Sequence, residues 1–266
     1  MTGSLGKSVV LWSVVACGLV ILSAPTVVVL GASFTAGNII AFPPEGLSLK
    51  WYSRIAGAGD LWNAFQRSLY VAFVCTLAAI PVGTLAGIAL AKYAVRPEKT
   101  IQVYLLLPFT IPLIGSGIGL MLLFGDLRLL GQLWPVGIAC CVINLPFMIW
   151  AVMASASALD PELELAAASC GAPPLSTFLH VTLPAVVPGV ISGSLLMFIL
   201  ALNEFLVSLL LVDARIVTLP VHIYNSIRSI ITPDLAAISV VFIACAAAAV
   251  LLLDRLVGLE IFLKSK

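Results

Sequence analysis

Long stretches of apolar residues with almost no charged side chain constrain the fold of this chain more than any other feature. A transmembrane helix needs about 20 mostly apolar residues to cross the hydrocarbon core of a bilayer. About six stretches reach this length, and among them only the fifth contains a charged side chain, Glu204. We therefore expect transmembrane helices over residues 8–34, 68–91, 101–124, 131–154, 184–212 and 235–253.

The composition indicates the same class of protein. Of 266 residues, 62% are hydrophobic and only 9% are charged, whereas a soluble domain carries roughly 25% charged residues. These few charges could not solvate the surface of a soluble domain, so we predict an all-α membrane protein in which residues 1–266 form a single transmembrane domain. The net charge of +1 argues against a nucleic-acid partner.

The first apolar stretch could instead be a signal peptide, because Lys7 precedes it and Cys17 follows small residues, as at a lipoprotein cleavage site. The apolar run continues for about 17 residues beyond Cys17, however. The apolar core of a signal peptide is only about 7–15 residues long. We therefore expect the first helix to remain uncleaved.

The orientation in the membrane rests mainly on one short loop. Over the whole chain, Lys and Arg residues are divided almost equally between the two sides of the membrane. The loop over residues 92–99 is compact and carries three basic residues, Lys92, Arg96 and Lys99. Cytoplasmic loops are enriched in Lys and Arg, so we expect this loop and both termini to lie in the cytoplasm.

Small and helix-breaking residues predict a packed bundle with kinked helices. Gly83 and Gly87 form a G-x-x-x-G pattern, which allows helix backbones to approach closely. Prolines, which remove a helical hydrogen bond, fall inside or near several apolar runs. They are Pro81, Pro108, Pro112, Pro146 and Pro188.

The connection over residues 160–182, which we call the elbow, has the signals of a short helix followed by a bend. Asp160 can cap a helix start, and Pro161 fits the first helical turn. Gly171 can adopt the left-handed conformation that ends a helix, and Pro173 prevents its continuation. Such an elbow is either a solvated connector or a docking surface, and the residues alone leave both open. It holds no Lys or Arg, so its acidic residues require basic partners elsewhere.

The elbow resembles the EAA loop of ABC-importer inner-membrane permeases, whose pattern is roughly E-A-A-x-x-x-G followed by L-P. The resemblance implies a type I ABC-importer permease fold in which the elbow is a cytoplasmic helix that docks on a separate ATPase subunit. The residues implied in this coupling are Glu164, Leu165, Ala166, Ala167, Gly171, Leu183 and Pro184. The sequence departs from the pattern at one position, because the expected Glu is Leu165 and the acid is Glu164, about 100° away around a helix.

Other segments resemble the spermidine/putrescine permease branch of this binding-protein-dependent family. They are residues 42–46, 47–52, 203–205, 218–224 and 232–237. The resemblance implies import of a polyamine or related small amine across the cell inner membrane. It also implies several partners: ATPase subunits, a second permease subunit that is identical or homologous, a periplasmic or extracellular substrate-binding protein, and membrane lipids.

Asn203 and Glu204 are the candidate residues of a substrate path, because an acid within an apolar run is costly and often functional. A helix that starts at Pro184 would, however, carry Glu204 to the outer interface, where water solvates a charge. We expect no catalytic group, metal site or cofactor, and the chain lacks the G-x-x-x-x-G-K-[ST] loop that binds ATP. Two rival functions are a stand-alone secondary transporter, which predicts inverted repeats, and a membrane enzyme, which predicts clustered catalytic groups.

Overall fold

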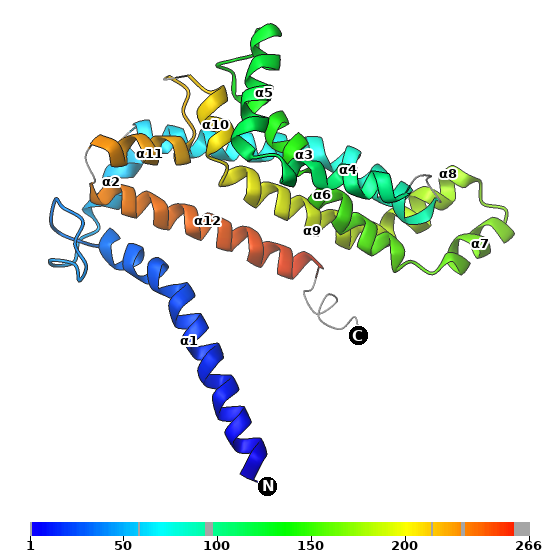
Figure 1. The fold of residues 1–266 in the computed structure, drawn as a ribbon, viewed down its shortest axis with the longest axis horizontal. Coiled ribbons are helices and arrows are strands. Elements are labelled where there is room, and N and C mark those ends of the chain that lie inside the picture. Colours follow the sequence, from blue (N-terminus) through cyan, green and yellow to red (C-terminus); the bar gives the residue numbers. More distant parts are fainter. Residues whose placement is uncertain (1, 58, 94–97, 214, 230–231, 258–266) are drawn as a thin grey trace. The chain divides into compact units, whose positions relative to one another are not determined.

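The computed structural model describes residues 2–57, 59–93, 98–213, 215–229 and 232–257, and these residues form helices and connecting segments (Figure 1). Within these ranges, extended pairing is limited to one isolated bridge, between Thr35 and Leu47. The predicted all-α class is confirmed. The helices are α1 (Thr2–Ser33), α2 (Lys50–Gly57), α3 (Gly59–Lys92), α4 (Glu98–Thr110), α5 (Leu113–Asp126), α6 (Leu133–Ser157), α7 (Pro161–Ser169), α8 (Pro174–Thr177), the π-helical turn η1 (Phe178–Thr182), α9 (Leu183–Leu202), α10 (Leu206–Leu211), α11 (Leu219–Ser229) and α12 (Pro233–Val257).

The chain divides into two compact units, each with its own internal contacts. One unit comprises residues 1–62 and 223–245, and the other comprises residues 63–222 and 246–266. In the first unit, the buried side chain of Trp51 on α2 donates a hydrogen bond from Nε1 to the Thr35 carbonyl oxygen, at 2.9 Å. The second unit contains the elbow and the helices on either side of it.

Among the described residues, five helices are long and apolar enough to cross a membrane. They cover Val10–Ser33, Gly59–Lys92, Leu133–Ser157, Pro174–Leu202 and Pro233–Leu251. Four of them coincide with the predicted stretches 8–34, 68–91, 131–154 and 235–253 to within a few residues, apart from the longer start of α3. Part of the basic loop predicted to be cytoplasmic, residues 94–97, lies outside the described residues.

The third predicted helix, over residues 101–124, is corrected to two shorter helices, α4 and α5, of 13 and 14 residues. The break falls at Ile111 and Pro112. Pro112 has no N–H to continue the helical hydrogen bonds. Its ring also crowds the residue before it, Ile111, and so disfavours a helical conformation there. Pro112 instead adopts an extended ψ of 129°, and its carbonyl oxygen accepts the first N–H groups of α5, from Gly115 and Ser116.

The fifth predicted helix, over residues 184–212, is corrected at both ends. Helical structure begins about ten residues earlier, at Pro174, and runs through α8 and η1 into α9 without a break. Pro184 therefore lies inside a continuous helix and does not begin one. Pro184 has no N–H to donate, and a wider π turn lies just before it. In this turn the Leu183 N–H donates to the carbonyl oxygen of Phe178, five residues earlier. At the other end, α9 stops at Leu202 and a separate helix, α10, follows.

Helices α6 and α9 run side by side and form the main packed seam of the second unit (Figure 1). Met148 and Val152 on α6 and Met197 and Val186 on α9 are all fully buried, and the Met148 side chain lies against Gly193 of α9. Small residues bring the backbones together, as expected for membrane helices. A Cβ atom at Gly189 would lie 2.6 Å from the Ala151 carbonyl oxygen of α6.

The predicted close approach of the G-x-x-x-G pattern is also confirmed. Gly87 of α3 packs directly against α6, where an added Cβ atom would lie 2.8 Å from the Ile149 carbonyl oxygen. Its neighbour in the pattern, Gly83, packs against the Met148 side chain. Helix α6 therefore lies at the centre of the second unit, with α3 and α9 both packed closely on it.

Candidate functional site

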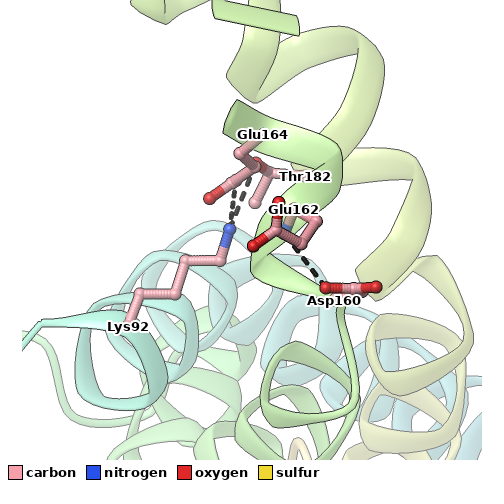
Figure 2. Close-up of polar contacts among 5 residues, drawn as sticks. All are labelled: Lys92, Asp160, Glu162, Glu164 and Thr182. Carbon is pink, nitrogen blue, oxygen red and sulfur yellow. Dashed lines mark hydrogen bonds and ion pairs between the residues drawn. The ribbon is translucent and has the colours of Figure 1, made fainter. Parts of the chain in front are cut away.

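The elbow begins with helix α7, whose start follows the predicted capping pattern. The Asp160 carboxylate accepts a hydrogen bond from the Glu162 N–H at 3.0 Å (Figure 2). Pro161 occupies the first helical turn, where its missing N–H leaves no bond unmade. The helix then continues for about two and a half turns in all, beyond the ends of α6 and α9 (Figure 1).

Gly171 ends α7 in the predicted left-handed conformation, with a φ of +83°. Its N–H donates to the Ala168 carbonyl oxygen at 2.9 Å, and the next N–H, from Ala172, donates to Ala167 at 3.1 Å. These bonds satisfy carbonyl groups that the end of the helix would otherwise leave free. The chain then turns through Pro173 into α8.

Helix α7 is held by few apolar contacts. None of its residues, Pro161–Ser169, all of which the structure describes, is buried. Leu163 and Leu165 point outward and are 53% and 59% exposed, and Ala166 is exposed beside them. An external helix with exposed leucines has a surface suited to contact with another protein.

Glu164 points about 100° away from Leu165 around α7, toward its own chain. Figure 2 shows the Glu164 carboxylate pointing at Lys92, the last residue of α3, and at Thr182, the last residue of η1. Glu164 Oε1 accepts hydrogen bonds from Lys92 Nζ and from Thr182 Oγ1, and Lys92 Nζ also donates to Thr182 Oγ1 at 3.3 Å. The end of α3 therefore meets two parts of the elbow, α7 and η1, at one polar cluster, although Lys92 and Glu164 are 72 residues apart in the sequence.

The surroundings of this cluster favour its charged form. The hydrogen bond from Lys92 and then that from Thr182 hold the pKa of the Glu164 carboxyl below its usual range, although partial burial opposes them. At neutral pH the carboxylate is thus ionised and paired. Because the Glu164 side chain remains 32% exposed, solvent screens the pair, and we expect it to contribute on the order of 1 kcal/mol to stability.

A groove of about 400 Å³ lies beside the cluster, between the end of α3 and the elbow. Lys92 and Glu164 line it together with apolar residues from both sides, among them Ile88 of α3 and Phe178 of η1. Beside the direct contact of Lys92 with Glu164, the apolar side chains of α3 and of the elbow thus leave a groove that they do not fill.

Asn203 and Glu204 lie in the break between α9 and α10, at the far end of α9 from the elbow. Twenty helical residues, which extend about 30 Å, separate the two sites. One oxygen of the Glu204 carboxylate accepts the Val207 N–H at 3.0 Å, near the start of α10, while Asn203 donates from Nδ2 to the Ile199 carbonyl oxygen. The Glu204 carboxylate thus takes the Val207 N–H, which a continuous helix would pair with the Asn203 carbonyl oxygen. The Asn203 backbone N–H, in contrast, keeps its helical bond to the Ile199 carbonyl oxygen, at 3.2 Å.

The elbow and Asn203–Glu204 are therefore separate sites.

Lys92 is a residue of the elbow site that was not recognised from the sequence. In the sequence it was used only to orient the chain in the membrane, although it lies against Glu164. The signal was the absence of any basic residue from an acidic elbow, which required a cation from elsewhere. Sequence spacing could not identify which cation, because Lys92 and Glu164 are 72 residues apart.

The arrangement of helices defines the class of protein. It resembles a chain in the crystal structure of a bacterial ABC transporter involved in the import of the acidic polysaccharide alginate, with a TM-score of 0.73 and 15% sequence identity. The match covers 96% of this chain and 98% of that chain. The fold is thus that of a type I ABC-importer permease.

The sequence assigns the family within that class. Residues 79–259 match the family model of the binding-protein-dependent transport system inner membrane component, and the chain belongs to this family. It is 30% identical to PhnV of Salmonella typhimurium, a permease provisionally assigned to 2-aminoethylphosphonate transport, over 80% of this chain and 81% of the relative. It is 27% identical to the putrescine transport system permease PotI of Escherichia coli, over 84% of this chain and 81% of the relative. The chain is therefore a multi-pass permease of a binding-protein-dependent transport system.

Proposed function

We propose that this permease imports a small amine and that helix α7 is the surface on which a separate ATPase subunit docks. The exposed position of α7, outside the apolar helices and ended by the Gly171 turn, is the observation that carries the docking role. Leu163, Leu165 and Ala166 supply an apolar contact face. The family Glu is absent from position 165, so this contact relies on packing more than on an ion pair.

In this proposal the elbow faces the cytoplasm, together with both termini. The opposite side receives a substrate-binding protein, and a second permease chain, identical or homologous, completes the path for the substrate. Membership of a binding-protein-dependent family supports these partners. The position of Lys92 beside the elbow supports the same orientation, because short cytoplasmic loops and helix ends are rich in Lys and Arg.

A pull-down from the native membrane in mild detergent, followed by mass spectrometry, tests the assembly. We expect this chain to bring with it an ATPase subunit and a second permease. A folded chain recovered alone would contradict the proposal and favour the rival, a stand-alone secondary transporter. The tagged chain carrying Cys170→Ser, a change at an exposed elbow position, serves as a control for the effect of substitution there.

A small amine as substrate is supported by the names of two relatives, PotI for putrescine and PhnV for 2-aminoethylphosphonate. The Glu204 carboxylate, at the break between α9 and α10, supplies a charge of the opposite sign. Breaks in membrane helices are common at transporter binding sites. We therefore place Glu204, with Asn203 beside it, on the substrate path.

A pair of substitutions separates the two possible roles of Glu204. Glu204→Gln removes the charge but keeps an oxygen that can accept the Val207 N–H. We expect it to raise the KM for labelled putrescine by about tenfold, a loss of about 1.4 kcal/mol of binding, without altering assembly. Glu204→Ala removes both the charge and the acceptor, so it should also lower thermal stability. An unchanged KM for Glu204→Gln would contradict a role in substrate binding. Glu204 would then serve only to accept the Val207 N–H near the start of α10.

A further inference from the structure

We infer that Lys92 is a positioning residue that ties α7 to the end of α3 through Glu164 and Thr182, so that a displacement of α7 moves α3 with it. The inference rests on the proposed docking of an ATPase on α7, and it assigns a role to Glu164, which points away from the proposed docking face of that helix. We call these three residues, Lys92, Glu164 and Thr182, the tie.

The first support is the orientation of the acid on α7. Adjacent residues of a helix point about 100° apart, so Glu164 and Leu165 cannot both face a partner that docks on one side. Leu165 is 59% exposed, whereas the Glu164 side chain is 32% exposed and is engaged by Lys92. The acid therefore serves a contact within the chain, and the outward position carries an apolar residue.

The second support is that α7 has no buried residue of its own to anchor it. A groove lies between the elbow and α3. Thr182, in contrast, is only 2% exposed and belongs to the helix that continues into α9. The tie thus connects an exposed helix to two long helices, α3 and α9, through charge-assisted hydrogen bonds, which are among the stronger polar contacts.

The third support is the position of Lys92 at the end of α3. A movement of α7 directed along α3 would act on the final turn of a 34-residue helix that packs on α6 through Gly87. Without the tie, α7 could move while α3 stayed in place. ATP hydrolysis would then continue without the matching movement of the spanning helices.

Limited proteolysis of the purified chain in detergent tests the anchoring itself. Chymotrypsin cleaves after exposed Leu residues, and Leu163 and Leu165 lie on α7. We expect Lys92→Met and Glu164→Gln each to accelerate cleavage there by about tenfold, because local opening costs less once the pair is broken. The exchanged pair, Lys92→Glu with Glu164→Lys, should restore protection, and the control Cys170→Ser should not change the rate.

Transport by the reconstituted complex tests the transmission. With the ATPase subunits bound, Lys92→Met and Glu164→Gln should lower the uptake of labelled putrescine per ATP hydrolysed by about tenfold, equal to about 1.4 kcal/mol of coupling. The exchanged pair should recover most of it. Recovery of normal amounts of ATPase subunit with each variant is part of the expected result, since the docking face is untouched.

Three results would overturn the tie. Wild-type cleavage rates in both single variants would show that the contact does not hold α7, whether or not an ATPase subunit is ever recovered. Loss of the ATPase subunit from Glu164→Gln alone would show that Glu164 contacts the ATPase. Failure of the exchanged pair to restore protection would show that the two charges act independently. A wild-type chain that recovers no ATPase contradicts the proposed function instead, and the proteolysis still decides the anchoring.

Discussion

Gly171→Arg should abolish substrate uptake while the chain remains in the membrane. Gly171 has a φ of +83°, a conformation that costs other residues roughly 1–2 kcal/mol. An arginine there would strain the turn that ends α7 and place a long cation beside the proposed docking face. The measurement is uptake of labelled putrescine by cells, together with the amount of ATPase subunit that is purified with the chain.

Two further substitutions at the same position separate strain from bulk. A Cβ atom at Gly171 would meet nothing within 4 Å, so Gly171→Ala adds strain alone and should cause only a partial loss. Gly171→Asn should retain most of the uptake, since Asn tolerates the left-handed region. Normal uptake by Gly171→Arg would contradict the assignment of the elbow as the coupling surface.

Gly189→Val should prevent the second unit from packing correctly. A single Cβ atom at this position would already lie 2.6 Å from the Ala151 carbonyl oxygen and 2.5 Å from Ser155 Oγ, so a branched side chain must push α9 away from α6. Overpacking of this kind costs about 1–3 kcal/mol, and more where the backbone cannot move. The expected result is a much lower yield of monodisperse protein and a lower midpoint of thermal aggregation in detergent.

The matched control is Gly119→Val in α5. A Cβ atom at Gly119 would meet nothing within 4 Å, and the same β-branched side chain would be added to a helix. The control therefore has the same intrinsic cost in helix propensity without the clash. Equal thermal midpoints for the two variants would show that the close approach of α6 and α9 does not limit stability.

Much of the fold could be predicted because hydropathy and length act locally. The bilayer requires about 20 apolar residues per helix, and stretches such as 131–154 show this directly in sequence. Capping and helix-ending signals are also local, which is why the roles of Asp160 and Gly171 in shaping the elbow could be predicted from a few neighbouring residues.

The parts that could not be predicted depend on contacts between residues far apart in the sequence, or on the backbone conformation around individual prolines. Pro112 breaks a helix, whereas Pro81, Pro146 and Pro188 lie inside helices that continue past them. Pro184 also lies inside a helix, with a π turn just before it. Composition does not distinguish these two outcomes. The partner of Glu164 was equally hidden, because an ion pair between separate helices leaves no periodic signal in sequence.

The π turn η1 also sets the phase of the helix that contains it. Each residue added to a turn rotates the side chains that follow it by about 100° around the helix. The extra residue in η1 therefore changes which side chains of α9 point in the same direction as those of α8. From the last residue of η1, Thr182, one buried stripe runs on through Val186, Gly189, Gly193 and Met197. The hydroxyl that meets Glu164 is thus the first member of the stripe that packs on α6. This stripe is about 22 Å long. A rotation of the helix at the elbow would therefore turn the whole face of α9 that packs on α6.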